Sequence, residues 1–141
     1  TGLSIIIIGF TLAIAIPVRQ NEPYYYTIDE TDYDAFIWIR DNISQEYDRA
    51  ILDPWKATAF TAITGKHVYT RTQMGPTAIG AETQHFLRDG SVDTKLLKAN
   101  RLSIIYTRIY DGQHNIDFRS DNPDLEEVAK NIYLLKEVNP Q

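Results

Sequence analysis

The chain contains no cysteine, and this absence removes several kinds of site at once. Without thiols it can form no disulfide, no cysteine nucleophile and no thiolate zinc site. The absence does not by itself fix the compartment of the protein.

Clustered basic residues are also missing. The 14 lysines and arginines are scattered, no two of them are adjacent, and the net charge is −5. A nucleic-acid surface needs Lys and Arg gathered on one face. We therefore expect no nucleic-acid partner.

The sequence lacks the short motifs of nucleotide-binding and hydrolytic enzymes. It has no G-x-G-x-x-G, no G-x-x-x-x-G-K-[ST] and no G-x-S-x-G. Its three histidines, His67, His85 and His114, are isolated and do not have metal-ligand spacing. The loop and helix-start acids are better explained by capping and solvation. We therefore predict no catalytic residue, metal site or cofactor within this chain.

What the chain does have is a core of ordinary size and an apolar head. It is 141 residues long and 43% hydrophobic, which suits one domain with an appendage. Residues 3–16 are apolar except for Ser4, Gly9 and Thr11. A membrane-spanning helix needs about 20 such residues, so this segment is short, but its first turns can lie upstream.

We interpret residues 1–17 as the end of a transmembrane helix that stops at Pro17 and contacts the lipid bilayer. Two alternatives stay open. A signal peptide would need a basic start and a cleavage site, neither of which is visible. A buried strand over residues 4–10, in a protein with no membrane anchor, would also suit four consecutive isoleucines.

The flank of the apolar segment predicts its orientation. Only Arg19 follows it closely, and residues 21–34 hold five carboxylates and no basic residue. Cytoplasmic flanks are usually enriched in Lys and Arg. We therefore place the rest of the chain on the extracytoplasmic side of the cell membrane, with residues 18–30 as a juxtamembrane linker and 31–141 as the domain.

The domain reads as an alternating α/β unit. Thr31 and Asp34 have capping-box spacing at the start of one helix. Residues 49–53 form an apolar strand, Asp53 is placed to cap a helix that ends at Gly65, and residues 66–70 form the next strand. Strand, helix and strand in so short a space predict a βαβ crossover with parallel strands.

The remaining elements follow less distinct signals. We predict helices over residues 82–90 and 91–101, the second capped by Ser91, and a strand over 102–110. Residues 111–124 are a polar loop or an Asp-Gly hairpin followed by a loop. A short helix over 123–131 and a last strand over 132–136, of undecided direction, complete the chain. The expected fold is a small Rossmann-like sheet, mostly parallel and flanked by helices.

One ligand site is predicted where the first strand meets its helix. Open α/β sheets bind ligands at the carboxyl ends of their strands. The candidate rim consists of Asp53, Trp55, Thr70 and Arg71, where the indole could stack on a sugar and the charged groups could bond its hydroxyls. A helix cap followed by a packing tryptophan would explain the same residues.

A second candidate site is Asn42. It begins the triplet "NIS", the acceptor pattern for N-glycosylation, at the end of the first predicted helix. The pattern has meaning only if the domain lies outside the cell.

Several motifs, in their order, resemble the extracytoplasmic C-terminal domain of archaeal and bacterial C-type membrane glycosyltransferases, including oligosaccharyltransferase-like proteins. The matching pieces span nearly the whole chain: "WIRDN", "RAILD", "TGKHVY", "LLKANRLSIIYT" and "NIYLLK". This resemblance implies that the domain positions an acceptor, a glycan or a lipid-linked sugar over a membrane-embedded active site. Any divalent metal would belong to that membrane part.

The chain also departs from the family. Catalytic oligosaccharyltransferase subunits have a Trp-Trp-Asp-Tyr-Gly signature where this chain has "LDPWK", so the acceptor-binding role is not carried over. The family's catalytic acids lie between upstream membrane helices, so we expect no catalysis from this fragment alone. The alternative interpretation is a membrane-anchored module that binds or senses a small ligand.

Overall fold

A computed structural model describes residues 27–71 and 77–136 of the chain. The predicted membrane segment 1–17 and residues 18–26 of the predicted linker lie outside these residues. Among the helices of the described ranges, none has the length and apolar character needed to cross a bilayer.

All four helices of the described residues lie before β3, and the rest of the described chain forms strands and loops. The helices are α2 Glu30–Asn42, α3 Ala57–Thr64, α4 Ala78–Arg88 and α5 Thr94–Ala99. The strands are β1 Arg49–Ile51, β2 His67–Val68, β3 Ile104–Tyr106, β4 Arg108–Tyr110, β5 Asn115–Asp117, β6 Leu125–Ala129 and β7 Ile132–Leu135.

Five of these strands form one sheet in the order β2-β1-β3-β7-β6. Strand β1 pairs in parallel with both β2 and β3, which confirms the predicted crossover and its neighbours. Strand β7 is antiparallel to β3, and β6 is antiparallel to β7. The fold is α/β as predicted, but the sheet is mixed and not mostly parallel, because the chain returns through β6 and β7 without a crossover helix.

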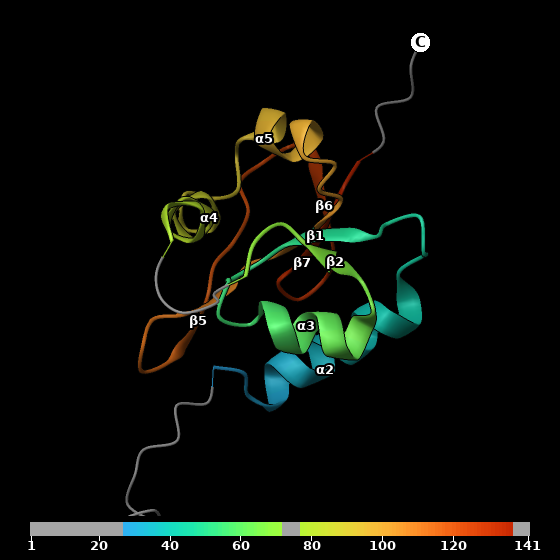
Figure 1. Cartoon of the computed structure of the whole chain (residues 1–141). Coiled ribbons are helices and arrows are strands. Elements are labelled where there is room, and N and C mark those ends of the chain that lie inside the picture. Colours follow the sequence, from blue (N-terminus) through green and yellow to red (C-terminus); the bar gives the residue numbers. More distant parts are fainter. Residues whose placement is uncertain (1–26, 72–76, 137–141) are drawn as a thin grey trace, which may run out of the picture.

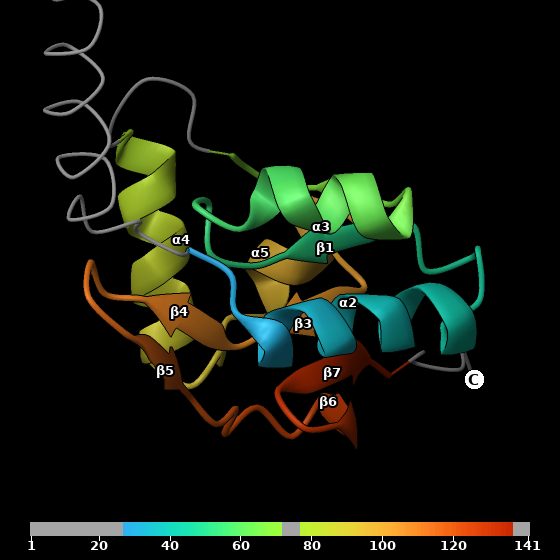
Figure 2. The same ribbon diagram turned by 90° about the horizontal axis from the view of Figure 1, so that it is seen from below.

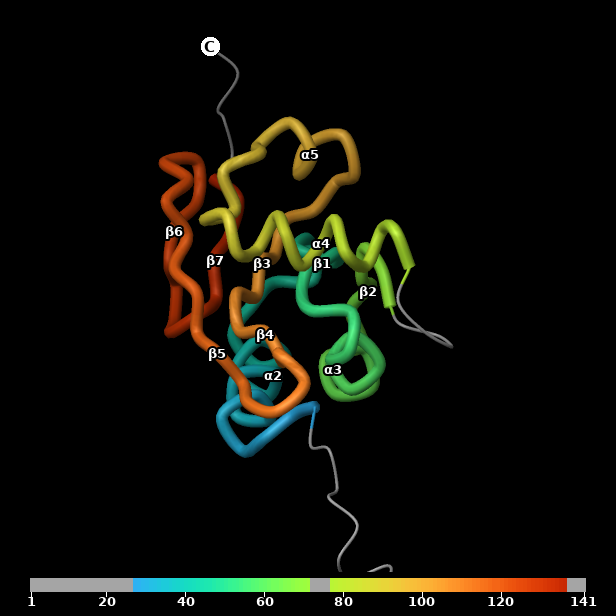
Figure 3. Tube along the Cα trace, turned by 90° about the vertical axis from the view of Figure 1, so that its left-hand side faces the viewer, coloured from blue at the N-terminus to red at the C-terminus, as the bar shows by residue number. Residues whose placement is uncertain are grey.

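Helices cover both faces of the sheet (Figures 1 and 3). On one face α2 and α3 pack on Ala50 and Ile104, and on the other α4 and α5 pack on Ile51 and Ile105. Successive side chains of a strand point to opposite faces, so the buried residues of β1, Ala50 and Ile51, and all of β3 are apolar. Each face thus has its own core cluster.

The start of α2 differs in register from the prediction. Asp29 is the N-cap, and its side chain and that of Asp32 accept hydrogen bonds from each other's backbone N–H groups. Thr31 is exposed and lies inside the helix. The capping box therefore starts two residues before the predicted one, and residues 29 and 30 belong to the domain instead of the linker.

The other helices confirm some predicted boundaries and correct others. Gly65 ends α3 with a φ of 71°, a left-handed conformation that glycine adopts without strain. Helix α4 begins at Ala78, earlier than predicted, with Thr77 as its cap. Asp93, and not Ser91, caps α5.

The predicted strand over residues 102–110 is broken at Thr107. The Thr107 N–H donates to the carbonyl of Asn131 at 3.0 Å, and its hydroxyl donates to the carbonyl of Phe118 at 2.6 Å. After this break β4 leaves the main sheet and pairs with β5 in a separate antiparallel hairpin. The Asp-Gly hairpin interpretation is confirmed, with Asp111 and Gly112 in its turn.

Figure 2 shows this hairpin beside α4, away from β6 and β7. Residues 123–131, predicted to be a helix, instead contain the edge strand β6. Its backbone pairs with β7 across an irregularity at Glu127, so sheet pairing overrides the helical preference of its glutamates. The predicted last strand is confirmed as β7.

Candidate functional site

A hollow of about 460 Å³ lies where the chain leaves β1, between α4 and the β4–β5 hairpin. It is lined by Thr27, Trp55, Gln84, Arg88, Tyr110, Asp111 and Gly112. These residues come from four separate stretches of the chain. The hollow has the volume and the mixed apolar and polar lining of a small-ligand site.

Asp53 lies beneath this hollow and is fully buried. One carboxylate oxygen, Oδ1, accepts from the Trp55 N–H at 3.2 Å and from the Gln84 Nε2 at 3.1 Å. The other, Oδ2, accepts from the Tyr110 N–H at 2.7 Å. A carboxylate with these three donors is well satisfied in a buried position.

Each of these donors belongs to a residue that lines the hollow. Asp53 therefore connects the first turn after β1 to helix α4 and to the hairpin. Its carboxylate faces the protein and not the solvent, so it cannot be the ligand contact that the sequence predicted. Its place in the structure is that of a positioning residue.

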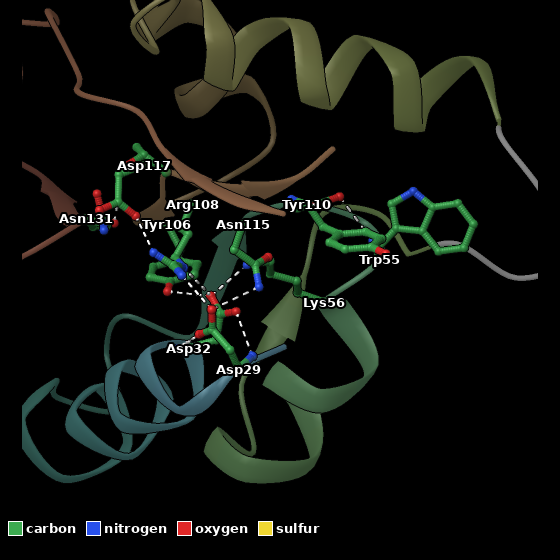
Figure 4. Close-up of polar contacts among 12 residues, drawn as sticks. Asp29, Asp32, Trp55, Lys56, Tyr106, Arg108, Tyr110, Asn115, Asp117 and Asn131 are labelled. Carbon is green, nitrogen blue, oxygen red and sulfur yellow. Dashed lines mark hydrogen bonds and ion pairs between the residues drawn. The ribbon is translucent and has the colours of Figure 1, made fainter. Parts of the chain in front are cut away.

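Aromatic side chains form one side of the hollow. Trp55 exposes 47% of its surface, whereas Tyr110 exposes only 9%. The Tyr110 hydroxyl donates to the carbonyl of Gly112 at 2.9 Å, which holds the hairpin turn against the ring. Figure 4 shows the Trp55 and Tyr110 rings near each other.

Charged groups of opposite sign complete the lining. The guanidinium of Arg88 lies over the Phe118 ring, 5.6 Å from its centroid, within cation–π range. Asp111 is held by its own turn, because its Oδ1 accepts from the Gln113 and His114 N–H groups at 2.8 and 2.7 Å. The His114 and Gln113 N–H groups lower the pKa of Asp111, so this exposed carboxylate stays ionised at neutral pH.

Of the four predicted rim residues, Trp55 alone lines the hollow. Thr70 is half-buried and Arg71 is exposed, and the structure does not bring either side chain into this lining. Gln84, Arg88, Tyr110 and Asp111 were missed, since nothing local in the sequence marks them. The Asp-Gly turn was the one available signal.

Asn42 lies at the end of α2 and is exposed, as glycosylation would require. Its side-chain amide donates to the carbonyl of Trp38 at 2.9 Å, an exposed bond that solvent could replace. Glycosylation of this residue stays a prediction.

A second cluster of polar side chains is buried beneath β4 (Figure 4). At its centre the fully buried Asp32 accepts from Lys56 Nζ at 2.6 Å and from the Tyr106 hydroxyl at 2.7 Å. Arg108 Nε lies 3.4 Å from the same oxygen. Burial lowers the pKa of Lys56, and the ion pair with Asp32 opposes this. Burial raises the pKa of Tyr106 well above its ordinary value, so its hydroxyl remains a donor.

The cluster continues to the surface through Arg108. Its guanidinium bonds Asp29 at 2.5 Å and Asp117 at 2.6 Å, and Asn115 donates to Asp29 at 3.1 Å. These contacts tie the start of α2 to both strands of the hairpin. The carboxylates face internal partners, so the cluster is best explained as structural.

Within residues 27–71 and 77–136, no group of three or more His, Asp or Glu side chains could hold a metal ion. His85 pairs with Asp89 at 3.1 Å on the exposed side of α4, and His67 is exposed on the edge strand β2. The hollow beside Trp55 is the candidate functional site.

The chain matches no protein-family model, no curated protein and no solved structure.

Proposed function

We propose that this chain is the extracytoplasmic domain of a polytopic membrane glycosyltransferase, and that it holds a glycan or a lipid-linked sugar in the hollow beside Trp55. The observation that carries the proposal is a half-exposed indole among polar groups that a buried carboxylate keeps in place. The membrane part of the proposal depends on the resemblance and on the apolar residues 1–17.

The chemistry of the lining suits a sugar ring. A pyranose has an apolar face of C–H groups, which packs on an aromatic ring, and an edge of hydroxyls that both donate and accept. Trp55 offers the aromatic surface, while Arg88 and Asp111 offer a donor and an acceptor at the same hollow. Large apolar contact combined with a few oriented polar groups is the general plan of small-molecule sites.

No reaction is assigned to this domain. The hollow holds no nucleophile with an adjacent base, and general acid–base chemistry needs convergent groups at hydrogen-bond distance. Catalysis, with any divalent metal, would belong to membrane loops upstream of this chain. Supplied with a lipid-linked donor, acceptors and Mg²⁺ or Mn²⁺, the chain alone should show no turnover.

A membrane-anchored sensor of a small ligand is the second candidate, because the same hollow could serve it. The number of upstream membrane spans separates the two candidates. Ten or so favour the transferase, and a single one favours the sensor.

The experiment uses the two tryptophans of the full chain, Trp38 and Trp55, as separate probes. In lipid nanodiscs, each indole N–H gives its own signal in a two-dimensional NMR spectrum. The probes are methyl glycosides of glucose, galactose, mannose and N-acetylglucosamine. At least one should shift the Trp55 signal saturably and leave that of Trp38 in place, because Trp38 packs on the core beneath α2 and α3 and does not line the hollow.

Two variants control this experiment. Trp38→Phe assigns the remaining signal to Trp55 and should bind as the parent does. Trp55→Ala should abolish binding, which is then followed through the backbone N–H of Gly112. Failure of all four sugars to shift Trp55 would refute the proposed function.

A further inference from the structure

The polar groups around the hollow divide into those that are already bonded and those that remain for a ligand. The Gln84 amide nitrogen is bonded to Asp53, and the Tyr110 hydroxyl is bonded to Gly112. Asp111 Oδ1 accepts two backbone N–H groups of its own turn. These hydrogen bonds fix the shape of the hollow.

Two charged groups keep bonding capacity toward the hollow. Asp111 has its second oxygen, Oδ2, which accepts no hydrogen bond from the described residues. Arg88 has its guanidinium N–H groups, which stack on Phe118 and donate to no acceptor within residues 27–71 and 77–136. The charged groups with capacity for a ligand are therefore one anionic acceptor and one cationic set of donors.

We propose that the hollow selects a neutral sugar ring, in which neighbouring hydroxyls donate to Asp111 and accept from Arg88, and that it rejects uronic acids and sugar phosphates. This inference rests on the proposed function and adds the charge class of the ligand. The ring would pack on Trp55, which lines the same hollow as both charged groups.

The charge balance gives the reason for this selectivity. Asp111 and Arg88 compensate each other, so the lining carries no net charge for an anionic ligand to neutralise. A ligand carboxylate or phosphate beside Asp111 would meet a like charge and would leave the Asp111 oxygen without a donor. A hydroxyl can donate to Asp111 and accept from Arg88 without either penalty. A site that hydrogen-bonds a hydroxyl discriminates strongly against ligands that cannot supply it.

The experiment compares matched pairs of ligands on the full chain in nanodiscs, with the Trp55 indole signal as the readout. The methyl glycosides of glucose, galactose and mannose are each compared with the corresponding uronic acid. All four sugars, N-acetylglucosamine included, are also compared with their 6-phosphates. For the sugar that binds, we expect the neutral form to bind at least about tenfold more tightly than its charged counterparts.

Asp111→Asn tests the assignment of the acceptor. Asparagine keeps an oxygen for the turn, so the hairpin is retained, but the charge is lost. Affinity for the neutral sugar should fall about tenfold, and the preference over the uronic acid should narrow or reverse. Glu126→Gln, which removes a carboxylate from the exposed edge strand β6, is the matched control and should change neither value.

The outcomes separate this inference from the proposed function. A uronic acid or phosphate that binds as tightly as its neutral partner, or an Asp111→Asn variant with unchanged selectivity, overturns the inference and leaves glycan binding intact. If no sugar of any charge shifts Trp55, both proposals fail.

Discussion

The role of Asp53 can be tested by two substitutions of its side chain. Asp53→Asn keeps the shape but replaces one acceptor oxygen with an NH₂ group, whereas Asp53→Ala removes every side-chain acceptor. The parent carboxylate is fully buried and accepts from the Trp55 and Tyr110 backbone N–H groups and from the Gln84 amide. Asp53→Asn therefore removes some of these hydrogen bonds, and Asp53→Ala removes all of them.

The expected losses follow from these bonds. A hydrogen bond to a charged group contributes about 1.5–3 kcal/mol, and a buried donor left unpaired costs about 1–3 kcal/mol. In Asp53→Asn the new NH₂ must face a donor, either the Tyr110 N–H or the donors at the other oxygen. We expect the free energy of unfolding to fall by about 2–4 kcal/mol.

Asp53→Ala should cost more, about 3–5 kcal/mol, because the buried Tyr110 N–H then has no partner. The Gln84 side chain can turn toward solvent, so its bond contributes less. Either loss is a large part of the 5–15 kcal/mol that stabilises a typical domain, at about 0.05–0.15 kcal/mol per residue.

The assay is urea unfolding of the full chain, followed by tryptophan fluorescence, with Glu126→Gln as the control. An exposed change of this kind should stay within about 0.5 kcal/mol of the parent. Sugar binding by the still-folded Asp53→Asn protein is then measured through the Trp55 indole signal. Binding should weaken in this variant, because three residues of the hollow are positioned by this one carboxylate.

Two results would refute this reasoning. An unchanged urea midpoint for Asp53→Asn would mean that the three bonds do not stabilise the fold. A lowered midpoint with unchanged binding would mean that Asp53 supports the core but does not position the hollow.

Three further predictions concern other residues. Lys56→Met should lower the free energy of unfolding by about 3–5 kcal/mol, because Asp32 is left buried without its cation. Adding Asp32→Asn to this variant should restore part of the lost stability. Equal urea midpoints in the single and double variants would contradict this prediction. Burial raises the pKa of Asp29, but the Asp32 N–H, Arg108 and Asn115 outweigh it and lower the value to about 2. Because this pKa is depressed in the folded state, its contribution is complete above the unfolded value of 3.8 and is lost as pH falls from about 4 to about 2. In acid titrations Asp29→Asn should therefore show a weaker pH dependence in that window than the parent. Asn42 from the native host should carry a glycan that Asn42→Gln removes, and an unmodified peptide at full occupancy in mass spectrometry would count against it.

The parallel half of the sheet was predictable because two of its strands, β1 and β3, lie inside the sheet and are covered on both faces. After Arg49, strand β1 is apolar, and β3 is apolar throughout, which is the pattern of a strand covered by helices on each side. The βαβ crossover was predictable from local signals too, because Gly65 marks the end of α3 and a short strand lies on each side of this helix. In such segments the local preference and the tertiary environment agree.

The antiparallel half was misread because its signals are weak. Strand β6 carries two exposed glutamates on an edge, and their helical preference outweighed the short alternation around them. Strand β4 follows β3 after a single residue, so no change in hydrophobicity marks where the chain leaves the sheet. The break depends on the bonds of Thr107 to residues 118 and 131, which sequence periodicity does not contain.

The charged cluster could not have been predicted for a related reason. Its main contacts join residues 74, 79 and 86 positions apart, such as Asp29 and Asn115. Each acid taken alone resembles a solvated cap or loop residue. Only the fold shows that Asp32 is fully buried beside Lys56, and that its burial is offset by an ion pair and a hydroxyl donor.

The hollow and the charged cluster depend on the same strand. Along β4, Arg108 bonds the start of α2, and Tyr110 donates its N–H to Asp53 beneath the hollow. The sequence placed Asp53 at the correct edge of the sheet but gave it the wrong task, because a strand-end carboxylate can face either ligand or protein. The departure of β4 from the main sheet determines which of these two the Asp53 carboxylate faces. It brings the Tyr110 N–H over Asp53, so the carboxylate is turned inward, and it carries Asp111 to the rim, where an ionised acceptor remains exposed.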